Sequence, residues 1–224
     1  MDAGAGLCRA CAAGLPRIPA ERCALCQEEP AAGGGERCPG CRARAGPLFA
    51  CLAGAAFAGA VEDAVHRFKY PAPGLRGLDP AAAALMRELV AWAAARAPGG
   101  APDLVVPVPL HPRRLRQRGF NPAAELARPA ARRCGARLDA AALWRLRDTP
   151  SQTGLGRGAR RRNVRGAFGA RPGWRAPARV WLVDDVVTTG ATLAAAALAL
   201  RRAGARQVVA LCAARAFRGR PRGS

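Results

Sequence analysis

Beyond the cysteine-rich N-terminal part, the apolar and polar positions predict strands that alternate with helices. Short apolar runs at 104–108, 180–183 and 207–212 have the length and composition of buried strands. The stretch 46–59 predicts a further strand or a short hairpin, and 164–168 predicts a strand after an arginine-dense loop. Because parallel strands need helical crossovers, this order predicts an α/β fold, a parallel sheet with helices on both faces.

Helix-start signals agree with this order. Asp79 and Pro80 suit the N-cap and the first helical position of one helix, and Asn121 and Pro122 do the same for another. Helical patterns also cover 59–70, 79–97 and 192–203. The basic residues between 108 and Asn121 predict a loop.

Six of the nine cysteines form three Cys-x-x-Cys pairs with eleven residues between successive pairs. One pair alone would also suit a redox motif, but two pairs supply the four thiolates that tetrahedral zinc prefers. We expect one closed structural Zn²⁺ site with the ligands Cys23, Cys26, Cys38 and Cys41. Cys8 and Cys11 would then either contribute to another site or lack a partner pair upstream.

The chain is strongly basic. Its net charge of +21 comes from 35 arginines and one lysine, Lys69, against 15 acidic residues. Such a charge favours polyanionic partners: nucleic acid, nucleotides or phosphorylated sugars. A GC-rich genome also enriches arginine, and diffuse positive charge aids solubility, so charge alone leaves the partner open.

No secretory leader is predicted, because the first residues lack a basic segment followed by an apolar one. The longest apolar run, at 191–200, is too short to span a bilayer. We therefore expect a cytoplasmic protein without membrane insertion, in which the cysteines are reduced.

Two adjacent aspartates, Asp184 and Asp185, follow the apolar run 180–183, and Thr-Thr-Gly-Ala-Thr follows at 188–192. In parallel α/β sheets, ligands bind beyond the carboxyl ends of the strands. The small residues predict a helix start whose free amides favour a phosphate, and carboxylates accept hydrogen bonds from a vicinal diol or hold Mg²⁺. Without a lysine, the string is not a nucleotide-triphosphate P-loop. A ribose carrying a 5-phosphate fits both halves of the motif.

The string 180–192 resembles the phosphoribosyl-diphosphate (PRPP) signature of type I phosphoribosyltransferases. Together with the cysteine pairs and the strings at 66–70, 106–121 and 150–168, it makes the chain resemble the ComF family. These are competence-associated bacterial proteins with a zinc ribbon ahead of a type I phosphoribosyltransferase-like domain. Members often carry four Cys-x-x-Cys pairs, where this chain has three. The resemblance implies a zinc ribbon at 1–46, a phosphoribosyltransferase-like domain at 47–217 and a disordered basic tail at 218–224.

By position, the resemblance also implies a site for PRPP or ribose 5-phosphate with Mg²⁺. Asp184 and Asp185 would be the catalytic residues and would hold the ribose hydroxyls. The 5-phosphate would be cradled by Thr188, Thr189, Gly190, Ala191 and Thr192. Candidate donors to the pyrophosphate are Arg113, Arg114 and Arg118. A hood loop that closes over the site would present Gln152, Arg160 and Asn163.

The sequence contains no recognisable base-binding loop, so three functions stand as hypotheses. The first is an active phosphoribosyltransferase with an unidentified acceptor. The second is a PRPP or nucleotide sensor without turnover. The third is a cytosolic accessory of DNA uptake that handles single-stranded DNA beside other competence proteins. We favour a PRPP-site protein linked to competence.

Overall fold

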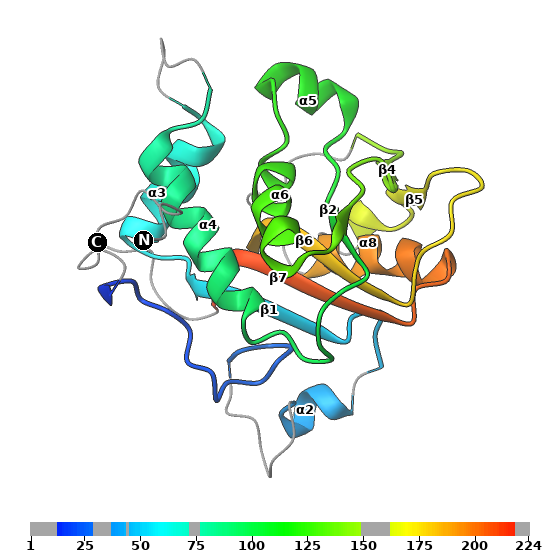
Figure 1. Ribbon diagram of the computed structural model, residues 1–224, viewed down its shortest axis with the longest axis horizontal. Coiled ribbons are helices and arrows are strands. Elements are labelled where there is room, and N and C mark those ends of the chain that lie inside the picture. Colours follow the sequence, from blue (N-terminus) through cyan, green and yellow to red (C-terminus); the bar gives the residue numbers. More distant parts are fainter. Residues whose placement is uncertain (1–12, 29–36, 44, 72–76, 149–161, 218–224) are drawn as a thin grey trace.

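The structure is a computed structural model and describes residues 13–28, 37–43, 45–71, 77–148 and 162–217 (Figure 1). Its helices are α2 (Pro39–Arg42), α3 (Ala60–Lys69), α4 (Pro80–Ala94), α5 (Pro112–Arg118), α6 (Pro122–Cys134) and α8 (Ala191–Arg202). Its strands are β1 (Ala50–Ala56), β2 (Leu104–Pro107), β3 (Arg137–Leu138), β4 (Leu143–Arg145), β5 (Phe168–Ala170), β6 (Arg179–Val187) and β7 (Gln207–Arg215). Within these ranges no helix is long and apolar enough to cross a bilayer.

Five of the strands form one parallel sheet in the order β1-β7-β6-β2-β3, so the first strand along the chain pairs with the last. The strands β4 and β5 form a separate antiparallel pair. The predicted α/β class with a parallel sheet is therefore confirmed.

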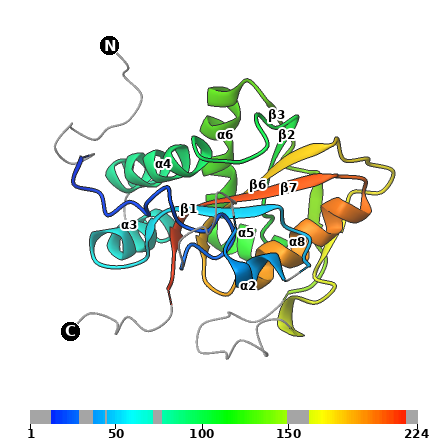
Figure 2. The same ribbon diagram turned by 90° about the horizontal axis from the view of Figure 1, so that it is seen from below.

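Helices cover both faces of the sheet, as Figure 2 shows. On one face, α3, α4 and α6 bury side chains such as Val209 and Leu211 of β7. On the other face, α8 packs over the alternate residues Ala210 and Cys212. This alternation is the period of a strand that is buried on both sides.

The helix-start signals worked because they rest on local hydrogen bonds. The Asp79 side chain accepts from the backbone N–H of Ala82 at 2.9 Å, and the Asn121 side chain accepts from that of Ala123 at 3.1 Å. Both helices then begin with a proline at the first position, where no N–H is needed.

Three sequence-based expectations were wrong in detail. The basic loop after β2 forms the helix α5, which starts at Pro112 and ends at Gly119 with a φ of 81°. The strand expected at 164–168 is displaced, because residues 162–164 form a helical turn and β5 begins at Phe168. The strand expected at 180–183 continues to Val187, because pairing with β7 continues that far.

Candidate functional site

The two aspartates lie in β6, just beyond the point where this strand stops pairing with β2. Pairing with β2 ends at Val183, which is opposite Pro107, whereas pairing with β7 continues to Val187. Asp184 and Asp185 therefore lie inside a strand, yet they stand past the carboxyl end of β2. Such an edge is where parallel α/β sheets bind their ligands.

Lys69 holds one carboxylate of this acid pair, Asp184 and Asp185. Its Nζ lies 2.9 Å from Oδ2 of Asp185, and both side chains are largely buried. Burial alone would lower the pKa of Lys69, but the charges of Asp185 and Asp184 raise it above its ordinary value. The sequence analysis did not place Lys69 in the site. The sequence held one signal for Lys69, because it is the single lysine among 36 basic residues.

Asp184 has a strongly raised pKa. Its burial, and then the negative charge of Asp185, raise its pKa to about 7, although Lys69 acts in the opposite direction. Its Oδ1 accepts a hydrogen bond from the backbone N–H of Asp185 at 2.9 Å. Asp184 can therefore exchange a proton near neutral pH, which makes the acid pair a functional-site candidate on physical grounds.

The three arginines proposed for a pyrophosphate divide into two groups. Arg118 donates to the Tyr70 hydroxyl at 3.0 Å, and its guanidinium lies 4.8 Å from the centre of the Tyr70 ring. Tyr70 directly follows Lys69 in the sequence. Arg113 and Arg114 instead face Asp148, at 3.7 Å and 3.9 Å. The structure thus places only Arg118 against the α3 segment that carries Lys69.

A further arginine, Arg145 in β4, was missed by the sequence analysis. Burial and the charge of Arg114 lower its pKa, while Asp184 and Asp148 raise it, so it lies among the charges of the candidate site. Arginine is so frequent in this chain that no sequence signal singled it out.

The string 188–192 forms the start of α8, as predicted. Gly190 is the N-cap residue with a φ of 72°, a left-handed conformation that favours glycine. Thr189 Oγ1 accepts from the backbone N–H of Ala191 at 3.4 Å, while Thr188 is exposed. The first amides of α8 therefore follow the acid pair by only a few residues along the chain.

The proposed hood loop is described only in part. Gln152 and Arg160 lie outside the described residues. Asn163 is half-buried in the helical turn at 162–164, just before the strand pair formed by β4 and β5.

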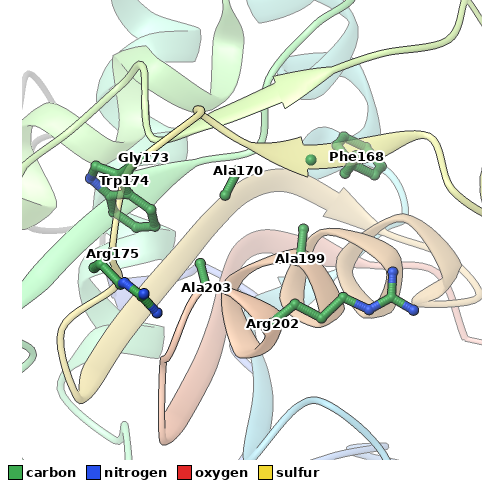
Figure 3. A pocket seen from close by; sticks show the side chains of 9 residues that line it. Phe168, Ala170, Gly173, Trp174, Arg175, Ala199, Arg202 and Ala203 are labelled. Carbon is green, nitrogen blue, oxygen red and sulfur yellow. The ribbon is translucent and has the colours of Figure 1, made fainter.

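A hollow of about 430 Å³ lies apart from the acid pair, between β5, the loop after it and the C-terminal half of α8 (Figure 3). Trp174 and Arg175 line it from the loop, and Arg202 lines it from α8. At a rise of 1.5 Å per residue, the 12-residue α8 puts its two ends about 18 Å apart.

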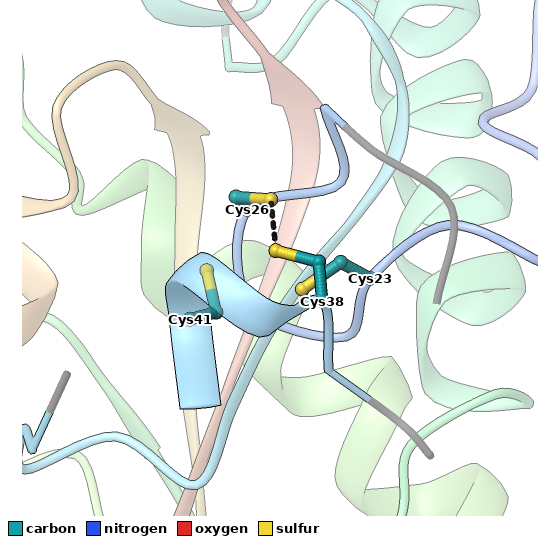
Figure 4. Close-up of side chains that lie close together, drawn as sticks. All are labelled: Cys23, Cys26, Cys38 and Cys41. Atoms are coloured by element: carbon teal, nitrogen blue, oxygen red, sulfur yellow. Dashed lines mark hydrogen bonds between the residues drawn. The ribbon is translucent and has the colours of Figure 1, made fainter. Parts of the chain in front are cut away.

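The structure gathers the four cysteines that were expected to bind zinc (Figure 4). All four sulfur atoms lie within 4.8 Å of one another, and the Sγ atoms of Cys26 and Cys38 are 3.8 Å apart. Metal–sulfur bonds of about 2.3 Å in a tetrahedron also put the sulfur atoms about 3.8 Å apart, so the spacing fits zinc. Cys8 and Cys11 lie outside the described residues.

Three of these thiols have a shifted pKa. Burial raises the pKa of Cys38 and of Cys41. For Cys23, hydrogen bonds from the backbone of Cys26, Cys38 and Leu25 outweigh burial and lower the pKa to about 6. A buried cluster of this kind does not hold four negative charges without a cation at its centre.

The segment that carries Cys23 and Cys26 is joined to the free edge of β1. The Cys51 N–H donates to the Ala24 carbonyl at 2.7 Å, and the Gln27 amide bonds both the N–H and the carbonyl of Ala53. These bonds use the backbone groups that an edge strand otherwise leaves open.

A buried arginine at the end of β7, Arg215, completes this attachment. Its guanidinium donates to the carbonyls of Leu25 and Cys51 at 3.1 Å and 2.7 Å, and to Gln27 Oε1 at 3.0 Å. The residue is 7% exposed. Arg215 therefore ties the Cys23–Cys26 pair to two strands of the sheet.

One known protein resembles this chain over most of its length, and others resemble about half of it. DNA utilization protein YhgH of Salmonella typhimurium is 34% identical over 215 residues, which are 94% of this chain and 90% of the relative. Competence protein F of Haemophilus influenzae is 34% identical over 112 residues, 48% of each chain. The chain belongs to the ComF family.

A further relative of this ComF-family chain is DNA utilization protein YhgH of Escherichia coli K12, which is 40% identical over 114 residues. That match covers 51% of this chain and 50% of the relative. No model of a protein family matches the chain.

Proposed function

We propose that this ComF-family chain binds PRPP or ribose 5-phosphate with Mg²⁺, in the manner of a type I phosphoribosyltransferase. The observation that carries the proposal is the acid pair at the carboxyl edge of the sheet, followed within a few residues by the glycine-capped start of α8. Carboxylates suit the ribose hydroxyls, and a helix start suits the 5-phosphate.

Each neighbour of the acid pair has a role in this proposal. Lys69 pairs with the Asp185 carboxylate and orients it to accept from a ribose hydroxyl. The amides that follow Gly190 receive the phosphate, and Thr192 adds a hydroxyl. Arg118, stacked on Tyr70 beside Lys69, is the arginine best placed to meet a diphosphate on the same sugar.

The donor set also fits Mg²⁺, since two adjacent carboxylates offer the oxygen ligands that a hard cation takes. The raised pKa of Asp184 also fits a bound cation, because the positive charge of the protein around this carboxyl group does not offset its burial and the charge of Asp185. When bound with a sugar diphosphate, Mg²⁺ supplies neutralisation of the charge on the departing pyrophosphate. The proposal concerns binding of the sugar phosphate. It names no acceptor for the phosphoribosyl group and does not include a transfer reaction.

A thermal shift tests this site. At a ligand concentration of about 100 times Kd, binding adds about 2.7 kcal/mol to the free energy of unfolding. We therefore expect PRPP or ribose 5-phosphate with Mg²⁺ to raise Tm by roughly 5 to 10 °C. Asp185→Asn should remove the rise, because it leaves Lys69 without its anion and the sugar with a weaker acceptor.

The control is Asp63→Asn, which removes an exposed carboxylate from α3 and should leave the rise intact. An unchanged melting curve at millimolar ligand would end the ribose-phosphate proposal.

We also propose that the protein acts in DNA uptake. Relatives with the names DNA utilization protein and competence protein support this role, as does the net charge of +21. A nucleotide or PRPP sensor without turnover is compatible with the same site, and a demonstrated transfer reaction would rule that alternative out.

We propose that the four-cysteine cluster holds one structural Zn²⁺, with the ligands Cys23, Cys26, Cys38 and Cys41. Purified protein should then carry about one zinc per chain. Cys38→Ser should lower the zinc content to nearly zero and lower Tm, because a closed metal site contributes its binding free energy to folding. Metal analysis and a melting curve measure both effects.

Cys134→Ser is the matched control, since Cys134 lies in α6 on another part of the fold. It should keep its zinc. A zinc-free protein purified under reducing conditions would refute the assignment, and two zinc ions per chain would bring Cys8 and Cys11 into a second site.

A further inference from the structure

The hollow beside α8 has the features of a small ligand site that the acid pair does not use. Its volume of about 430 Å³ lies within the range of about 300–1,000 Å³ typical of sites for small organic ligands. Small residues from facing elements, including Ala170, Ala199 and Ala203, leave this space open (Figure 3). The hollow has room for one base with its sugar.

Trp174 gives the hollow an aromatic wall that is held in place. One side of this half-buried residue packs against the apolar core, and the residue also lines the hollow. Its backbone N–H donates to the Arg171 carbonyl at 3.0 Å, in a turn that includes Gly173 with a φ of 71°. Nearby, the Ala176 N–H donates to the Ala203 carbonyl at 3.0 Å and ties the loop to the end of α8.

Arg175 and Arg202 give the hollow its charge. Both are exposed, and neither forms an ion pair with a carboxylate among the residues that the structure describes. They enter from different elements, Arg175 from the loop after β5 and Arg202 from α8 (Figure 3). A ligand that suits this hollow has a flat ring, which stacks on Trp174, and a negatively charged group near the ring, which meets Arg175 and Arg202.

We propose that this hollow binds one nucleotide unit of single-stranded DNA, with the base against Trp174 and the flanking phosphates near Arg175 and Arg202. Stacking on an aromatic side chain combined with cationic contacts to the backbone is how proteins bind single strands without reading sequence. In a duplex the base faces are covered, so the hollow discriminates against double strands.

Fluorescence anisotropy with a labelled oligo(dT) of about 12 nucleotides, a length within the usual site sizes, tests the proposal. Trp174→Ala should weaken binding about tenfold, the effect of losing one stacked base, and Trp174→Phe should retain most of the affinity. Arg175→Ala with Arg202→Ala should lower the salt slope by about 1.4, or about 0.7 for each phosphate that is no longer neutralised. Melting curves establish that each variant is folded.

The matched control is Arg132→Ala with Arg133→Ala, which removes two exposed arginines from α6 on the opposite face of the sheet. This control should leave both affinity and slope close to those of the unsubstituted chain. An equal loss in the control, or unaltered binding by Trp174→Ala, would overturn the proposal. So would binding of the matching duplex or of free dTMP as tight as that of the single strand.

The proposal goes beyond the ribose-phosphate site, and the two fail separately. Trp174→Ala should keep the full rise of Tm with ribose 5-phosphate and Mg²⁺, because neither aspartate of the acid pair lines the hollow. Loss of that rise in Trp174→Ala would show that the two regions are one site and would contradict the assignment.

Discussion

At pH 8 we expect Asp184→Asn to unfold at a higher temperature than the unsubstituted chain. Burial and the charge of Asp185 raise the pKa of Asp184 to about 7 in the folded protein, from 3.8 as the ordinary value. The ionised carboxylate therefore costs folding free energy, on the order of 2 to 4 kcal/mol. Asparagine removes the charge and keeps a side-chain oxygen for the backbone N–H of Asp185. The expected gain in Tm is roughly 5 to 10 °C.

The sign of the pH dependence follows from the direction of the shift. Between about pH 4 and pH 7 the folded protein retains a proton on Asp184 that the unfolded chain has lost. The free energy of unfolding of the unsubstituted chain therefore falls, relative to that of Asp184→Asn, as the pH rises through this interval. Above about pH 7 the difference stays constant. Melting curves from pH 4 to pH 8 measure it.

Asp63→Asn is again a suitable control, because its carboxylate is exposed and its Tm should follow that of the unsubstituted chain at every pH. A difference for Asp184→Asn that is the same at pH 4 and pH 8 would contradict the assigned acidity. The stabilised variant should also lose its response to ribose 5-phosphate, as expected where a binding site is maintained at a cost in stability.

The second large effect is expected at Arg215. Replacing it with methionine fills a similar space but leaves the carbonyls of Leu25 and Cys51 without the guanidinium donor, while Gln27 Oε1 keeps the N–H of Ala53. Each buried acceptor left unsatisfied costs about 1 to 3 kcal/mol, so Arg215→Met should lose about 3 kcal/mol or more. For a chain of this length we expect a fall in Tm of roughly 6 to 12 °C.

The same substitution should accelerate release of zinc to a chelator, because Arg215 holds the backbone carbonyl of Leu25 and the side chain of Gln27, the two neighbours of Cys26. Arg206→Met, at an exposed position one residue before β7, is the matched control and should change neither Tm nor zinc release. A Tm within about 1 °C of the unsubstituted value in Arg215→Met would show that the buried hydrogen bonds are replaced. Arg215→Lys should be intermediate, since it keeps the charge with fewer donors.

Local signals explain which parts of the fold could be predicted from the sequence. Asp79 and Asn121 mark helix starts through hydrogen bonds within their own turn, so a single sequence suffices to identify them. The end of β6 depends on its pairing with β7, which is distant in sequence, and it was placed too early. The helix α5 was missed because its arginines resemble those of a solvated loop, although Pro112 and Gly119 mark its ends.

The candidate site was predictable where it follows one string and not where it is assembled from several elements. Asp184, Asp185 and Gly190 lie in one recognisable segment. Lys69 reaches the acid pair from α3 and Arg145 approaches it from β4, and both elements are distant from β6 in sequence. The Arg215 clamp joins residues separated by 188 positions, a distance over which no sequence pattern gives guidance.

The pairing of the first strand with the last has a consequence for how the protein is made. During synthesis β1 emerges early, but its partner β7 and the guanidinium of Arg215 become available only after residue 215 has been added. Until then the inner edge of β1 remains exposed to other chains. The ligands of the proposed zinc site all emerge before β1, whereas the part of their attachment to the sheet that Arg215 provides forms only after β7 has been made. Errors in translation or truncation upstream of residue 215 should therefore leave a metal-loaded N-terminal segment on an incomplete sheet.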